Sequence, residues 1–381
     1  WGANNNGLLG LNDTTRYSSP VQVGSDTTWS KASVAAFYTS SFGIKTDNTL
    51  WSWGYNEVGQ LGLNQAGHTA SIKFSSPVQI PGTTWDSMTS NSYTTLATKT
   101  DGTLWGWGEN KVGTLGLNQA AATYISSPTQ IPGTTWSSVH LGSTIVTAIK
   151  TDGTLWKWGQ NGYGQLGDGN NTHQRVPVKI VDANVTQVAA GWHHTLFLKK
   201  DGSVWSTGRN QPGQLGNGTQ TDRNSPFRVI EENATDVACG YYHSFILMND
   251  GSLLAFGSNN HSRSGLPISQ DYLNPRIVFT QGIKSVSGGN THSLFLKTDG
   301  SLWASGYNQY GQVGAGELGH SIKLTKIVDA GIAGISAGHN HSIYWTTSGE
   351  VYAFGSDNSG QLGLGRKIRM TSPHVIYDPS Q

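Results

Sequence analysis

The stretch Gly54-Tyr-Asn-Glu-Val-Gly-Gln-Leu-Gly62 decides the fold, because its pattern, Gly-x-Asn-x-x-Gly-Gln-Leu-Gly, recurs along the chain. Further copies lie at Gly108–Gly116 (with Thr114 in place of glutamine), Gly159–Gly167, Gly208–Gly216, Gly306–Gly314 and Gly355–Gly363, and weaker copies at Gly2–Gly10 and Gly257–Gly265. Successive first glycines are 49 to 54 residues apart. A period of this size indicates a solenoid, a propeller or an array of repeated units.

The composition of the chain restricts the kinds of partner that it can have. Among 381 residues, 24 are lysine or arginine and 23 are aspartate or glutamate, which gives a formal net charge of +1. So small a charge provides no field for non-specific binding to nucleic acid or to an anionic membrane. No apolar stretch approaches the roughly 20 residues of a membrane-spanning helix. We therefore expect no specific nucleic acid and no membrane span. Because the chain opens inside a motif, at Trp1-Gly2, we expect the native N-terminus to lie upstream.

A second signature, Lys-Thr-Asp-Gly-Thr-Leu-Trp, lies between successive glycine motifs. It occurs at Lys99–Trp105 and Lys150–Trp156 and, in varied form, at Lys45–Trp51, Lys199–Trp205 and Lys297–Trp303. Asp-Gly is typical of a tight hairpin turn, because glycine accepts positive φ. The alternating apolar residues on both sides of the turn suit pleated strands. Each repeat therefore contains a central β-hairpin.

Two more strands complete each repeat. After the glycine motif comes a short extended segment that opens with proline, as in Val176-Pro-Val-Lys-Ile180 and Ser225-Pro-Phe-Arg-Val229, and such a proline belongs on an outer strand. Before the hairpin comes a segment such as Val185–Gly191, and no segment has helical periodicity. Four short strands in each repeat form the blade of a β-propeller.

The number of hairpin turns gives the number of blades. The turns lie at Asp47, Asp101, Asp152, Asp201, Asp250, Asp299 and Ser348, which predicts an all-β, seven-bladed propeller of four-stranded antiparallel blades. The glycine motif nevertheless occurs eight times, and Pro20–Val23 supplies an extra outer strand. Because propeller rings are commonly closed by strands from both termini, we expect one blade to combine the two ends of the chain.

The repeat runs from end to end, so we expect a single β-propeller domain over residues 1–381. Its repeats lie near residues 1–53, 54–107, 108–158, 159–207, 208–256, 257–305 and 306–354, with a partial repeat at 355–381.

The signatures together resemble those of the RCC1 repeat family. The resemblance rests on Gly-x-x-His-[Ser/Thr], then Asp-Gly-x-Leu-Trp with the glycine motif, then Pro-x-x-Val or Ile, and it is complete from Gly191 to Ile230. It implies an RCC1-like propeller whose function depends on sites carried by the scaffold. The family includes nucleotide exchange factors, photoreceptors, enzyme inhibitors and effectors.

Four histidines, His194, His243, His292 and His341, recur every 49 residues. One histidine in each blade cannot supply the three or four ligands that a zinc ion requires within about 2.3 Å. We expect these histidines to form structural hydrogen bonds within or between blades, and we predict no metal. Gly162–Gly167 matches a dinucleotide-binding pattern by letter but lacks the strand and helix around it, so we predict no nucleotide and no other cofactor. No set of potential catalytic residues lies outside the repeated positions of the motifs. This indicates that the protein is not an enzyme.

Comparison among the repeats separates fixed positions from variable ones. If the blades are equivalent, the variable positions of the glycine motif lie on one face. Tyrosine and arginine are enriched at interface hot spots, and the candidate partner-binding residues are Tyr55, Tyr163, Arg209, Tyr307 and Tyr310. We expect a monomeric, non-catalytic scaffold that presents this face to a protein. The alternatives are an exchange factor for a small GTPase, an inhibitor of a secreted enzyme, a virion or cell-surface adhesin, and an engineered propeller with no native function.

The two halves of the chain differ in sequence. Thr-Thr-Trp ends at Trp29, Trp85 and Trp136 in the first half and is absent from later repeats, whereas eight of the nine arginines follow residue 170. This asymmetry suggests a recent duplication or a chimera of two related repeat sets, of bacterial or phage type.

Overall fold

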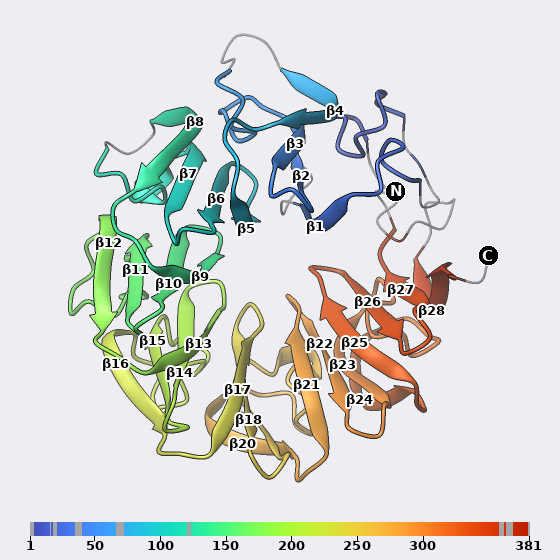
Figure 1. Cartoon of the computed structure of the whole chain (residues 1–381). Coiled ribbons are helices and arrows are strands. Elements are labelled where there is room, and N and C mark those ends of the chain that lie inside the picture. The colour runs from blue at the N-terminus through green and yellow to red at the C-terminus, as the bar shows by residue number, and fades with distance from the viewer. Residues whose placement is uncertain are drawn as a thin grey trace. The chain divides into compact units, whose positions relative to one another are not determined.

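The structure is a computed structural model that describes residues 4–15, 17, 21–34, 40–65, 72–119, 123–357, 362 and 369–379. The strands form seven four-stranded antiparallel sheets, and Figure 1 shows that each sheet uses four strands that are consecutive in the chain. The helical segments of the described residues are two short 3-10 turns, η1 (Lys111–Gly113) and η2 (Asn260–Ser262). The predicted all-β, seven-bladed propeller fold is confirmed.

Three sheets precede residue 182. They are β1 (Trp29–Val34), β2 (Ser40–Lys45), β3 (Leu50–Tyr55) and β4 (Lys73–Gln79); β5 (Trp85–Ser90), β6 (Thr94–Lys99), β7 (Leu104–Glu109) and β8 (Tyr124–Ile131); and β9 (Trp136–Leu141), β10 (Ile145–Lys150), β11 (Leu155–Gly159) and β12 (Gln174–Val181).

Four sheets follow. They are β13 (Val185–Ala190), β14 (His194–Lys199), β15 (Val204–Gly208) and β16 (Arg223–Ile230); β17 (Ala234–Cys239), β18 (His243–Met248), β19 (Leu253–Gly257) and β20 (Tyr272–Phe279); β21 (Ile283–Gly288), β22 (His292–Lys297), β23 (Leu302–Asn308) and β24 (Gly319–Val328); and β25 (Ile332–Ala337), β26 (His341–Thr346), β27 (Val351–Gly355) and β28 (Met370–Tyr377).

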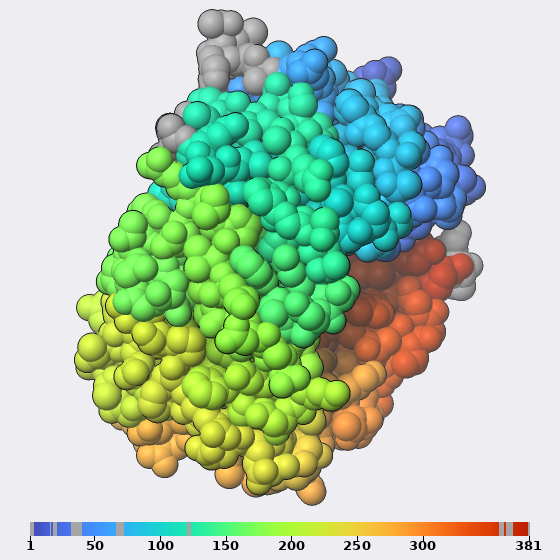
Figure 2. Space-filling model, turned by 60° about the vertical axis from the view of Figure 1, so that its left-hand side comes forward, coloured from blue at the N-terminus to red at the C-terminus, as the bar shows by residue number. Residues whose placement is uncertain are grey.

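The chain divides into two compact units. The first comprises residues 1–17, 21–162 and 170–185, and the second comprises residues 18–20, 163–169 and 186–381. Figure 2 colours the second unit from yellow-green through yellow to orange and red in chain order. The single domain over residues 1–381 stays a prediction. No helix among the described residues has the length and apolar character needed to cross a bilayer.

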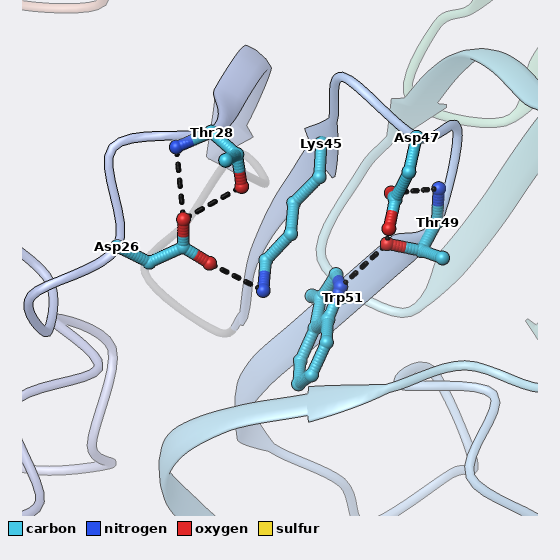
Figure 3. A network of polar contacts seen from close by, with 6 residues as sticks. All are labelled: Asp26, Thr28, Lys45, Asp47, Thr49 and Trp51. Atoms are coloured by element: carbon cyan, nitrogen blue, oxygen red, sulfur yellow. Dashed lines mark hydrogen bonds and ion pairs between the residues drawn. The ribbon is translucent and has the colours of Figure 1, made fainter.

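The hairpin signature folds as its turn chemistry predicts. Figure 3 shows the first sheet, in which one carboxylate oxygen of Asp47 accepts hydrogen bonds from the backbone N–H of Thr49 at 3.0 Å and from its hydroxyl at 2.7 Å. The indole N–H of Trp51 donates to the same hydroxyl at 2.9 Å, and the ammonium of Lys45 lies 3.9 Å from the centre of the Trp51 ring. Lys45 also pairs with Asp26 at 2.5 Å. The repeated Lys, Asp, Thr and Trp therefore form one local network that fixes the turn.

The outer strands carry the prolines, but not at their first residues. β16 begins at Arg223, and Pro226 lies inside it, where the pairing with β15 shifts register between Ser206 and Gly208. The irregularity places the residue that lacks an N–H donor outside the regular ladder, on the edge strand of the sheet. The expected outer position is confirmed, and the expected place at the start of the strand is wrong.

The predicted closing blade stays a prediction, because Pro20 of the expected extra strand lies outside the described residues. The described sheet of the last repeat takes its four strands, β25 to β28, from residues 332–377. In this sheet Val375 of β28 pairs with Tyr352 of β27. Residues 21–23 form no strand.

The glycine motif at Gly54–Gly62 forms a loop that packs on the following sheet. Asn56 accepts a hydrogen bond from the backbone N–H of Leu61 at 2.9 Å, which closes the loop. The carbonyl of Gln60 then accepts from the Trp107 indole and from the Thr95 hydroxyl, both at 3.0 Å. The motif thus joins one blade to the next.

The N-terminal copy of the glycine motif, introduced above as Gly2–Gly10, packs on the first sheet in the same way. The carbonyl of Leu8 accepts from the Trp53 indole at 2.8 Å and from the Ser41 hydroxyl at 2.7 Å. Asn4 closes this loop by accepting from the backbone N–H of Leu9 at 2.9 Å. The N-terminal copy therefore contributes a loop to the first sheet.

Candidate protein-binding surface

The Gly-x-x-His signature is the turn between the first and second strands of a blade. A Cβ atom added at Gly191 would lie 2.1 Å from Cε1 of His194, so the glycine leaves room for the imidazole. Nε2 of His194 lies 2.9 Å from the hydroxyl of Ser244 on the next sheet. The pairs His243–Ser293 and His292–Ser342 repeat this contact at 2.9 and 2.8 Å. The predicted structural hydrogen bonding between blades is confirmed for these three histidines.

The tautomer of these histidines follows from the hydrogen bonds. The hydroxyl of Ser244 donates to the carbonyl of Gln214 at 2.8 Å, so its only proton is used there. Nε2 of His194 must then carry the proton that reaches Ser244. Burial lowers the pKa of His194 to about 3, and the imidazole is neutral at physiological pH. Its role is to connect blades.

The two residues between glycine and histidine form an aromatic surface in the second unit. Trp192 stacks on His193 with ring centroids 4.4 Å apart and on Tyr241 at 4.9 Å, and Tyr242 meets the edge of Trp192 at 5.4 Å. Adjacent turns are joined through the backbone, because the N–H of Trp192 donates to the carbonyl of Tyr241 at 3.2 Å. Trp192, Tyr241 and Tyr242 are all partly exposed.

Two of the predicted residues extend this surface. Tyr163 lies 4.9 Å from the ring of His193, and the guanidinium of Arg209 lies 5.1 Å from the centre of the Tyr163 ring. Loops of the glycine motif and Gly-x-x-His turns are therefore adjacent in this unit. We call Tyr163, Trp192, His193, Arg209, Tyr241 and Tyr242 the aromatic surface.

Burial keeps the imidazole of His193 and the phenols of Tyr241 and Tyr242 uncharged. Burial, and to a smaller extent Arg209, lower the pKa of His193, so this imidazole is neutral at physiological pH. Burial raises the pKa of Tyr241 and of Tyr242, so both phenols stay protonated. The surface thus presents neutral aromatic edges and phenol hydroxyls, together with the cation of Arg209.

The other two predicted residues of this unit form a second group. Tyr307 and Tyr310 lie 6.2 Å apart, measured between ring centroids, and His261 packs on Tyr307 at 5.1 Å. The guanidinium of Arg369 lies 5.1 Å from the ring of Tyr310. Tyr307 also hydrogen-bonds Gln309.

Tyr55 belongs to the first unit, so the structure does not bring it together with the other candidates. Its hydroxyl donates to the carboxylate of Glu57 at 2.5 Å.

The sequence comparison missed Trp192, His193, Tyr241 and Tyr242, and it also missed Arg263. One sequence feature could have revealed the first four of these residues. In two consecutive repeats, both residues between the glycine and the histidine of the Gly-x-x-His turn are aromatic or histidine. For Arg263, the signal was an arginine at the motif position that holds glutamine or threonine in the strong copies.

The side chains of this surface are of the types that are enriched at protein interfaces. Stacked aromatic rings and an arginine are the side chains that anchor protein interfaces. Within the described ranges, no three His, Cys, Asp or Glu side chains gather as the ligands of a metal ion would.

The fold is a β-propeller in which loops of the glycine motif and Gly-x-x-His turns together form the aromatic surface. The family model of the RCC1-like domain matches residues 1–229 and 132–380. The chain belongs to the RCC1-like family.

Relatives with similar sequences cover part of the chain. The chain is 30% identical over 200 residues to the ultraviolet-B receptor UVR8 of Arabidopsis thaliana, which covers 51% of this chain and 45% of the receptor. It is 28% identical over 169 residues to the probable E3 ubiquitin-protein ligase HERC4 of Homo sapiens, which covers 42% of this chain and 16% of the ligase. The matched region therefore spans less than half the length of each relative.

Two solved structures share the fold. Prp20p of Saccharomyces cerevisiae matches with a TM-score of 0.68 at 22% identity over 88% of each chain. Human WBSCR16 matches with a TM-score of 0.69 at 22% identity over 87% of this chain and 95% of that chain.

Proposed function

We propose that this protein is a non-catalytic interaction module that binds another protein through the aromatic surface. The observation that carries the proposal is the stack in which Trp192 lies 4.4 Å from His193 and 4.9 Å from Tyr241. These rings come from turns that also contact each other through the backbone, so the edges of the rings are held in place before a partner arrives. Preorganised aromatic side chains lose little entropy on binding.

The relatives support a protein as the partner. Prp20p is described by its binding to Gsp1p and to histones, and a further structure contains Kap60 bound to yeast RCC1. The formal charge of +1 also favours a protein surface over nucleic acid, because nucleic-acid binding depends on neutralising many phosphates.

The test is affinity capture with the folded, immobilised chain, followed by measurement of the affinity for the captured protein. We expect Trp192→Ala to weaken that affinity by about thirtyfold, which corresponds to about 2 kcal/mol, because the change removes the centre of the stack. The matched control is Phe227→Ala on the outer strand β16, which removes another partly exposed aromatic ring.

Thermal unfolding of both variants separates lost binding from lost folding. Equal affinity of the wild type and Trp192→Ala for the captured protein would contradict the proposal. Equal weakening by Trp192→Ala and Phe227→Ala would also contradict it.

A further inference from the structure

Arg263 occupies a position at which three other copies of the glycine motif hold a glutamine with a structural role. There a glutamine folds back on its own loop, as in Gln60, whose side-chain oxygen accepts from the backbone N–H of Val58 at 3.0 Å. Gln165 and Gln312 do the same for Tyr163 and Tyr310, at 2.9 and 3.0 Å. An arginine has no acceptor and cannot form this bond.

The guanidinium of Arg263 instead bridges two loops. Nε donates to the carbonyl of Asn260 at 3.0 Å, and Nη1 donates to the carbonyl of Asn290 in the next Gly-x-x-His turn at 3.3 Å. That turn contacts the aromatic surface directly, because the N–H of Tyr241 donates to the carbonyl of Gly289 at 3.2 Å. Arg263 therefore lies against the turn adjacent to Tyr241 and Tyr242.

This buried charge has no acidic partner among the described residues. Arg263 is only 6% exposed, and within the described ranges no carboxylate oxygen lies within 4.0 Å of its guanidinium nitrogens. Asp271 acts on it electrostatically from a greater distance. Removing a charge from water without a counterion is unfavourable, and two carbonyl contacts offset only part of that cost.

Arg209 is a second cation near the same place. Its Nη2 donates to the side chain of Gln211 at 2.6 Å, and it too forms no ion pair among the residues described. Arg209 and Arg263 both favour the ionised form of Tyr242, although burial outweighs them and raises its pKa. The loops that carry the two arginines lie against the aromatic turns, because the N–H of Arg209 donates to the carbonyl of His193 and the N–H of Ser258 donates to the carbonyl of Tyr242, both at 2.9 Å.

We propose that the surface around Tyr242, between Arg209 and Arg263, receives the carboxylate of an aspartate or glutamate side chain of a protein partner. This inference rests on the proposed function and specifies the chemistry of its partner. A guanidinium matches a carboxylate in geometry and charge. The positively polarised ring edges around the site add a favourable environment for an anion.

The test uses the full chain and a phage-displayed library of random linear peptides. We expect the selected peptides to share an aspartate or glutamate at one position. Arg263→Gln should weaken binding of such a peptide by about ten- to hundredfold. The variant should fold normally, because glutamine occupies this position in other copies, and its melting temperature should equal or exceed that of the wild type. Arg228→Gln, on the outer strand and paired with Glu231 at 2.9 Å, is the matched control and should bind as the wild type does.

A double-mutant cycle identifies the contact. Replacing the shared acidic residue of the peptide with its amide should weaken binding to the wild type as much as Arg263→Gln does, and the two changes together should add little more. Free glutamate should displace the peptide at lower concentration than inorganic phosphate does. Stronger displacement by phosphate would overturn the assignment of a carboxylate.

The outcomes separate the two proposals. If Trp192→Ala abolishes peptide binding while Arg263→Gln leaves it unchanged, the carboxylate site is wrong and the proposed function stands. A selection that returns no peptides, or peptides without a shared acidic residue, also overturns the carboxylate site. If neither substitution changes the affinity for the captured protein partner, the proposed function itself is wrong.

Discussion

At the scale of single residues, the repeating histidine is the clearest link between sequence and stability. The structure buries His194, His243 and His292 completely and gives each a serine on the next sheet. Among the described residues, the Nδ1 atoms of these histidines have no hydrogen-bond partner. Protonation would therefore place a charge in an apolar interface without an acceptor to stabilise it.

This arrangement predicts a loss of stability in acid. Burial lowers the pKa of His194 and of His292 to about 3 and holds that of His243 well below its usual value. The unfolded chain takes up these protons first, so stability is complete above a pH of about 6.5 and falls as pH decreases toward about 3. Each histidine contributes a slope of about 1.4 kcal/mol per pH unit in this range.

Urea unfolding at a series of pH values measures that slope. His243→Gln should reduce the slope of the free energy of unfolding against pH by the contribution of one histidine. The control is the exposed His320, whose replacement by glutamine should leave this slope unchanged. A free energy of unfolding that does not change between a pH of about 6.5 and about 5 would show that the buried imidazoles are not neutral.

The residue scale also shows how much of the site could be predicted. Variation among the glycine motifs was enough to select Tyr163 and Arg209, which the structure places in contact. Trp192 and Tyr241 were missed because they lie 49 positions apart in sequence, and their importance comes from stacking between turns of adjacent sheets. Tyr55 shares their residue type and belongs to the other unit. Residue type alone does not reveal which side chains meet.

At the scale of elements, the loop of the glycine motif determines how one blade joins the next. Its asparagine is fully buried and supplies both donors and an acceptor. In the fourth sheet, Asn210 accepts from the N–H of Leu215 at 2.9 Å and donates to the side chain of Asn217 at 2.8 Å. The loop has no other regular structure, so these bonds fix its shape.

Asn210→Ala should lower the free energy of unfolding by about 2 to 3 kcal/mol, because it leaves buried backbone groups without partners. Chemical denaturation measures the change. Asn249→Ala, at an exposed hairpin turn, is the control and should cost less than about 0.5 kcal/mol. Similar losses for the two variants would mean that the buried asparagine does not fix the loop.

Elements whose signals are local were predicted from the sequence, whereas contacts between distant residues were not. The Asp-Gly turns form hairpins because turn chemistry and strand alternation act over a few residues. The contacts of the N-terminal motif copy join residues more than 30 positions apart, and such contacts leave no local pattern in the sequence. The N-terminal motif copy was correctly singled out, but it supplies a loop that binds Trp53 and Ser41.

At the scale of the whole molecule, most of the residues that recur in the repeats stabilise strands, turns and loops. The carboxylates of the hairpin turns bind their own serine or threonine, and the imidazoles bind serines of the next sheet. Specificity is therefore left to the residues between the fixed positions. In the second unit these include the aromatic surface and Arg263.

Hydrogen exchange of the chain with and without its captured partner tests the central claim most directly, because a bound surface exchanges more slowly. We predict slower exchange in the turns at 191–194 and 240–243 and in the loop at 208–213, with unchanged exchange in the outer strands β16 and β20. Protection confined to β16 and β20, with the two turns unaffected, would contradict the assignment of the aromatic surface as the binding site.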